Sequence, residues 1–193
     1  MTGIWFTSDL HIGHIKVAEL RGFNTDIHDQ VLADRWDRTV GPKDQVWVLG
    51  DISAGGDRAE TAALEWVAAR PGIKHLIAGN HDGCHPLHRL SHRWQPIYLD
   101  VFASVQQSAV RRIAGERVLL SHFPYPGPGD DHTDETRYPD YRFIDTGRWL
   151  LHGHTHHWKA QRGRQLHVGV DAHRLTPVPL RWVEDRIREW GQQ

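Results

Sequence analysis

Five short segments of the chain carry aspartate, histidine or asparagine side chains that could bind metal ions. The first is SDLH, in which Asp9 and His11 stand two residues apart directly after an apolar run. Alternate residues of an extended chain point to the same side, so this carboxylate and imidazole could chelate one ion together. The pattern alone is common by chance, and its interpretation as a metal site depends on the other four segments.

Polar side chains also follow the second and third apolar runs. VWVLGD places Asp51 after a glycine, where its carboxylate could bind a metal or simply cap the next turn. IAGNHD places Asn80, His81 and Asp82 in a row, which supplies a carbonyl oxygen, an imidazole and a carboxylate able to orient that imidazole. Three such groups directly after a buried strand favour a functional site.

The last two segments add three histidines. LLSH ends in His122, and LLHGHTH places His154 and His156 two residues apart beside Gly153. In α/β sheets, ligands collect outside the carboxyl ends of the strands, so residues far apart in sequence can converge there. We therefore expect the five segments to form one site, since chance would have to place all of them at the same sheet edge.

The apolar runs predict an α/β fold. Runs bounded by Gly, Asp or Pro predict buried strands at 3–8, 45–50, 73–78, 117–121, 148–152 and 165–170. Apolar residues at helical spacing predict helices over 27–40 and 58–70, so the front half reads β-α-β-α-β with parallel strands. A hairpin that turns near Ala114 and Gly115 is expected over 101–121, and a closing helix over 180–190. The sheet would be mixed, or there would be two packed sheets.

The segment 124–147 is rich in Pro, Gly and Asp and shows no sustained period. It predicts a long loop, and such loops are usually functional or disordered. Its aromatic residues could fold over a substrate, or the loop could simply lie on the surface. These residues are Tyr125, Tyr138, Tyr141 and Phe143.

Length and composition limit the class of protein. The 193 residues fit a single domain spanning 1–193. No apolar run is long enough to cross a bilayer, and the N-terminus lacks the features of an export signal, so we expect a cytoplasmic protein. The formal net charge of −1 provides no general positive field, so long nucleic acid is not the expected partner. The oligomeric state is left open.

In their order along the chain, the motifs DxH, GD, GNHD, H and GHTH resemble those of the calcineurin-like metallophosphoesterases, across residues 9–156. The resemblance implies a four-layer α/β/β/α sandwich with two mixed β-sheets. It also implies two metal ions that share one bridging carboxylate. The ligands of the first ion would be Asp9, His11, Asp51 and His156, and those of the second would be Asp51, Asn80, His122 and His154.

A centre of this kind implies a metal-dependent phosphoesterase. Two ions roughly 3.5 to 4 Å apart can bridge a hydroxide and hold the ester for in-line attack on phosphorus. The mixed oxygen and imidazole ligands suit Mn, Fe or Zn, with Ni also possible, and relatives that hydrolyse esters often use Mn, the metal we expect. His81 would be catalytic, protonating the leaving group beside Asp82. His14 and Arg21 follow DLH closely and would contact the substrate phosphate.

The compact chain has no obvious separate substrate domain, which favours a phosphodiesterase acting on small nucleotide or cyclic nucleotide esters. A phosphomonoesterase, including a protein phosphatase, is the alternative enzyme. A catalytically silent scaffold is the alternative outside enzymes, although such proteins usually lose ligands that this chain retains. The other histidines are expected to be solvated or satisfied by backbone, or, in the case of His85, His88 and His92, to lie on a polar helix face or rim the pocket.

Overall fold

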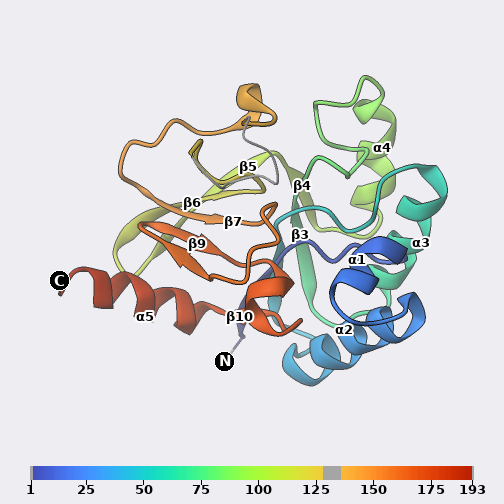
Figure 1. Ribbon diagram of the computed structural model, residues 1–193, viewed down its shortest axis with the longest axis horizontal. Coiled ribbons are helices and arrows are strands. Elements are labelled where there is room, and N and C mark those ends of the chain that lie inside the picture. Colours follow the sequence, from blue (N-terminus) through green and yellow to red (C-terminus); the bar gives the residue numbers. More distant parts are fainter. Residues whose placement is uncertain (1, 128–135, 193) are drawn as a thin grey trace.

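A computed structural model describes residues 2–127 and 136–192, and within these ranges the strands form two packed five-stranded sheets (Figure 1). The first sheet has the order β10-β1-β2-β3-β4. Its strands β1 to β4 run parallel, and β10 pairs antiparallel with β1. The strands are β1 (Ile4–Thr7), β2 (Gln45–Val48), β3 (Ile73–Ile77), β4 (Ser104–Gln106) and β10 (Val178–Pro179).

The second sheet has the order β5-β6-β7-β9-β8. Its central strands β6, β7 and β9 are parallel, and the edge strands β5 and β8 pair antiparallel with their neighbours. The strands are β5 (Ser108–Ile113), β6 (Glu116–Ser121), β7 (Trp149–His152), β8 (Gln161–Arg162) and β9 (Gln165–His167). The expected α/β fold with two mixed sheets is confirmed.

Four helices lie on the side of the first sheet that faces away from the second (Figure 1). They are α1 (Ile15–Leu20), α2 (Thr25–Thr39), α3 (Asp57–Ala68) and α4 (Ser91–Leu99). A fifth helix, α5 (Leu180–Trp190), follows β10, and two short 3-10 helices are η1 (Pro139–Tyr141) and η2 (Val170–His173). No helix of the described residues combines the length and apolarity needed to cross a membrane.

Strand β2 shows why the run from Val46 to Leu49 is apolar without interruption. Val46 and Val48 pack into the core between the first sheet and its helices, whereas Trp47 and the following Leu49 pack into the core between the two sheets. Successive side chains of a strand point to opposite faces, so a strand buried on both faces needs an unbroken apolar run. Residues of α5, including Val183 and Ile187, also pack into the core between the sheets.

The outer face of the second sheet carries Leu119 and Leu150, which pack against Tyr125 and the partly buried Phe143. Tyr125 is only 2% exposed, and its hydroxyl group donates a hydrogen bond to the Arg148 carbonyl oxygen. These parts of the predicted loop are therefore packed against the sheet and are not free to fold over a substrate. Residues 128–135, with His132, lie outside the described residues.

Most of the predicted elements are present, but two predictions need correction. The hairpin turns at Ala114 and Gly115 as expected, yet it begins only at Ser108, because residues 104–106 form a strand of the first sheet. Helix α4 begins at Ser91, so His85 and His88 lie in turns before it and share no helix face with His92.

Candidate metal centre

The loops that follow β1, β2, β3, β6 and β7 converge where the two sheets meet, and they carry all the predicted metal ligands. Three of these strands belong to the first sheet and two to the second. The site therefore lies between the sheets, and both of them must pack correctly to assemble it.

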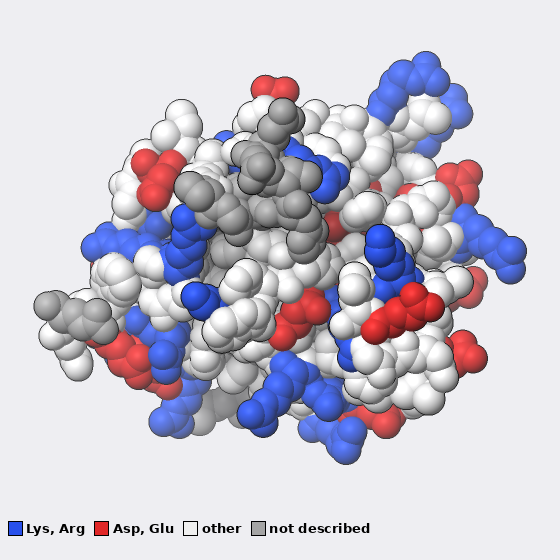
Figure 2. Space-filling view, viewed as in Figure 1, with Lys and Arg blue, Asp and Glu red and all other residues white. Residues whose placement is uncertain are grey.

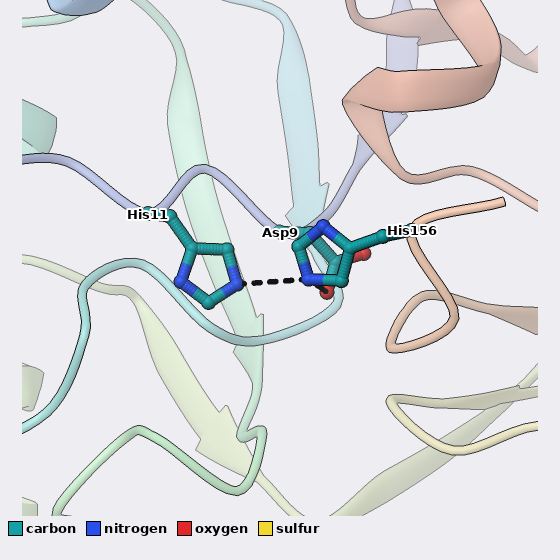
Figure 3. A group of neighbouring side chains, drawn as sticks. All are labelled: Asp9, His11 and His156. Atoms are coloured by element: carbon teal, nitrogen blue, oxygen red, sulfur yellow. Dashed lines mark hydrogen bonds and ion pairs between the residues drawn. The ribbon is translucent and has the colours of Figure 1, made fainter. Parts of the chain in front are cut away.

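The first donor group consists of Asp9, His11 and His156, whose ligand atoms all lie within 4.8 Å of one another. The Nε2 atoms of His11 and His156 face each other in Figure 3. They lie 3.1 Å apart. The His156 Nε2 is also 3.9 Å from an Asp9 carboxylate oxygen. Two imidazole nitrogens and a carboxylate oxygen that converge in this way fit a transition-metal ion.

The second donor group consists of Asp51, His122 and His154, again with ligand atoms within 4.8 Å of one another. His122 Nε2 lies 3.2 Å from His154 Nδ1 and 3.2 Å from the Asn80 side-chain oxygen, so the structure brings Asn80 next to this group. His122 Nδ1 donates to the Leu49 carbonyl oxygen at 2.7 Å. That bond directs Nε2 toward the other donors and suits it to bind a metal.

The carboxylate of Asp51 lies between the two donor groups. Its Oδ2 is 3.4 Å from His122 Nε2 in the second group and 3.9 Å from His11 Nε2 in the first. Its Oδ1 accepts a hydrogen bond from the backbone N–H of His81 at 2.9 Å, which fixes the orientation of the carboxylate. This position fits a ligand shared by two ions.

The charges in the centre also suit cations. Burial would raise the pKa of Asp9 and of Asp51, but the surrounding histidines hold the pKa of both carboxylates well below the ordinary value. Burial lowers the pKa of His11 to about 3, so its imidazole is neutral. Burial also acts to lower the pKa of His122, but the Asp51 carboxylate overcomes this and raises it to about 9. A cation entering the second group would displace that proton.

The backbone at the site adopts a conformation that L-residues rarely populate. Five predicted ligands have positive φ angles, and such backbone persists only where the surrounding structure holds it. They are Asp9, His11, Asp51, His154 and His156, with φ between 49° and 71°. Gly153 is required for a related reason, because a Cβ at this position would clash with the side chains of Ser8 and Asp9.

His81 lies beside the centre without belonging to either donor group. Its side chain is 40% exposed, and its Nε2 is 4.0 Å from Asp51 Oδ2. The expectation that Asp82 orients this imidazole is wrong. Asp82 is fully buried and accepts hydrogen bonds from the backbone N–H groups of Asp51, Ile52 and Gly79, at 2.9, 3.1 and 2.7 Å. It holds together the loops that follow β2 and β3.

The two residues expected to contact substrate have different surroundings. His14 caps α1, is half-buried, and has its ring 5.6 Å from that of His11, so it borders the centre. The side chain of Arg21 is only 6% exposed and donates to both oxygens of Asp171, at 2.8 and 2.7 Å, and to the Asp9 carbonyl oxygen at 2.8 Å. We correct its expected role from a substrate contact to a residue that positions the centre.

Sequence reasoning missed Asp171, whose Oδ2 accepts a hydrogen bond from His156 Nδ1 at 3.1 Å. This contact turns the Nε2 of His156 toward His11. A signal was present, because Asp171 directly follows the predicted strand 165–170 and is another polar residue at a strand end.

His167 was expected to be solvated or satisfied by backbone, but it is only 2% exposed. Its ring nitrogens have no hydrogen-bond partner among the described residues. Its Nε2 lies 3.8 Å from a carboxylate oxygen of Asp9.

Comparisons with known proteins agree with this geometry. The Gene 66 proteins of Mycobacterium phages D29 and L5 are each 47% identical to this chain, over 98% and 89% of its length and 96% and 88% of theirs. A protein of unknown function from Aquifex aeolicus has the same fold, with a TM-score of 0.70 and 22% identity over 96% of this chain and 99% of that one. Residues 2–158 match the family model of the calcineurin-like phosphoesterases, and the chain therefore belongs to this family of metal-dependent phosphoester hydrolases.

Proposed function

We propose that the protein hydrolyses small phosphodiesters at a centre of two divalent metal ions. The observation that carries the proposal is the pair of facing donor groups with the Asp51 carboxylate between them. When bound, two such ions neutralise phosphate oxygens and supply a nucleophile near neutral pH. Carboxylate, amide and imidazole donors together suit manganese, with iron, zinc and nickel as the other candidates.

The surroundings of His81 support a role as proton donor to the leaving group. Its imidazole is partly exposed and lies next to the bridging position of Asp51, but it is not one of the converging donors. It also lines a cavity of about 520 Å³ together with Asn80. A leaving group in this cavity would be within reach of the imidazole, which is what general acid catalysis requires.

Two cavities support a diester over a monoester. The cavity lined by Asn80 and His81 adjoins the second donor group, and another of about 610 Å³, with His156 in its wall, adjoins the first. A phosphodiester carries two organic groups, and each cavity could accept one of them. A monoester would leave one cavity unused.

The proposal includes a small ester and a cytoplasmic location, with no long nucleic acid as partner. Basic and acidic side chains are interspersed on the face that Figure 2 shows, and the formal net charge is −1. A protein that binds long nucleic acid usually concentrates positive charge along the path of the backbone.

A panel of mono-, di- and cyclic nucleotide esters, assayed with Mn²⁺, tests the proposal. We expect higher kcat/KM for diesters than for monoesters with the same nucleoside and leaving group. The opposite order would identify a phosphomonoesterase. Failure to hydrolyse any ester, with both metals shown to be bound, would identify a catalytically silent scaffold.

A further inference from the structure

The cavity of about 610 Å³ beside His156 has the volume of a small-molecule site. Its walls come from α1, α2, the loop after β7 and the region of η2, and Asp171 and Arg21 also line it. Apart from Thr155, its other lining residues are apolar, aromatic or cationic. The ones that matter here are Leu20, Phe23, Arg35, Trp158 and Arg174.

The charge of this cavity favours an anion. Arg21 is paired with Asp171, so their charges offset each other. Arg35 and Arg174 add two more guanidinium groups, and no described residue supplies either of these side chains with a hydrogen-bond or ion-pair partner. Guanidinium groups bind phosphate oxygens in a bidentate manner, so two of them without partners suit a phosphate group.

An exposed aromatic ring borders the same cavity. Trp158 is 73% exposed, and its ring stacks on that of His157 with 5.6 Å between the ring centroids. Leu20 is 79% exposed nearby on the cavity wall. Lys159 Nζ also lies over the Trp158 ring, 5.4 Å from its centroid. A nucleobase that displaced this long side chain would have the largely exposed ring as a stacking surface.

The cavity beside His81 has the opposite charge. Asp57, Glu60 and Arg89 line it, which gives two carboxylates against one guanidinium. An anionic part of the substrate would therefore bind more favourably in the cavity beside His156. Because the two cavities differ in charge, the organic group that carries an additional anionic charge would bind beside His156, and the other organic group of the diester would bind beside His81.

We propose that the cavity beside His156 binds a nucleoside phosphate, with its base against Trp158 and its phosphate between Arg35 and Arg174. The proposal rests on the proposed phosphodiesterase activity and narrows the substrate class. The substrate would be a phosphodiester in which one of the two organic groups is a nucleoside that carries a further phosphate.

Three p-nitrophenyl esters with Mn²⁺ test each part of this proposal. They are bis(p-nitrophenyl) phosphate, the p-nitrophenyl ester of thymidine 3′-phosphate, and the same thymidine ester with an added 5′-phosphate. Trp158→Ala should raise KM for both thymidine esters about 10-fold more than for bis(p-nitrophenyl) phosphate, because only they carry a base. Arg35→Gln combined with Arg174→Asn should raise KM about 10-fold more for the 5′-phosphorylated ester than for the other two. Asparagine is chosen at 174 because it tolerates the φ of 53°.

Arg38→Gln is the matched control, since Arg38 is an exposed residue of α2 that does not line the cavity. It should change the three KM values equally or not at all.

The possible outcomes separate this inference from the phosphodiesterase proposal. If the wild type hydrolyses bis(p-nitrophenyl) phosphate but the cavity variants change the KM of all three esters equally, this inference fails and the phosphodiesterase proposal stands. If the wild type hydrolyses none of them, the phosphodiesterase proposal fails. Calorimetric binding of thymidine 3′,5′-bisphosphate to the wild type and both cavity variants then decides the inference, and equal affinities would overturn it.

Discussion

Asp51 has the position of a ligand shared by both ions, and its substitution should therefore be the most damaging in the centre. Its Oδ2 faces His122 of one donor group and His11 of the other. We expect Asp51→Asn to lower kcat about 10²-fold or more, and more than His156→Ala does, because a bridging carboxylate also fixes the spacing of the two ions. Assays of both variants at saturating Mn²⁺ check this. Near wild-type activity of Asp51→Asn would show that the centre is not dinuclear.

His81 should matter most for substrates with a poor leaving group. An alkoxide needs a proton as it leaves, and general acid catalysis usually contributes about 10²- to 10⁴-fold. His81→Ala should lower kcat by that factor for an alkyl or nucleoside ester and much less for a p-nitrophenyl ester, with metal content unchanged. Equal losses for both esters would mean that His81 stabilises charge on phosphorus and donates no proton. A fall in metal content would mean that it is a ligand.

Asp171 offers a test of how the first donor group is held. Its carboxylate fixes His156 and is itself fixed by Arg21. Loss of such a supporting carboxylate typically costs about 10- to 100-fold in metal affinity, so Asp171→Ala should weaken one of two Mn²⁺ sites by that factor and leave the other unchanged. Calorimetric titration measures both, with Asp185→Ala on α5, where the side chain is 45% exposed, as the control. Equal weakening of both sites would contradict this role.

At the scale of residues, the convergence of the candidate ligands could be predicted because each of them follows a recognisable apolar strand. The contact between Arg21 and Asp171 could not, because 150 positions separate the two residues along the chain. The positive φ angles of Asp9 and His156 could not be predicted from the sequence either. Tertiary contacts impose them, although both residue types ordinarily prefer negative φ angles.

At the scale of elements, long apolar patterns predict helices and strands correctly, whereas short patterns do not. Helix α1 spans only Ile15–Leu20, and α4 contains Pro96, which usually disfavours a helix interior. Sequence patterns do not separate strand β4 from the hairpin that follows it, because a short strand shows no sign of which sheet it joins. The hairpin turn itself was predicted well, because Ala114 and Gly115 adopt the positive φ angles of a two-residue turn.

Asp82 connects the loops after β2 and β3 through hydrogen bonds, and we expect these bonds to contribute to the free energy of unfolding. Its buried carboxylate accepts three backbone hydrogen bonds. Asp82→Ala should lower the free energy of unfolding by about 3 kcal/mol, since buried N–H groups would be left without an acceptor. Urea denaturation of the metal-free protein measures this, with exposed Asp100→Ala as the control. Equal stability of the two variants would show that the loops do not depend on Asp82.

At the scale of the whole molecule, the site exists only because two sheets meet along one line of strand ends. His122 and His154 come from the second sheet, and Asp9, Asp51 and Asn80 come from the first. The sequence alone left open whether one sheet or two would form, because the same buried apolar runs suit either arrangement. Family resemblance supplied the two-sheet answer, and the packing of Leu49 against Leu120 and Leu151 in a shared core gives its physical basis.

The most direct test of the dinuclear centre is a calorimetric titration of metal-free protein with Mn²⁺, with hydrolysis of bis(p-nitrophenyl) phosphate followed at each addition. We predict binding of two ions per chain, hydrolysis that rises as the second site fills, and loss of activity on chelation. Binding of one ion or none per chain, or hydrolysis that persists after the metal is removed, would contradict this account.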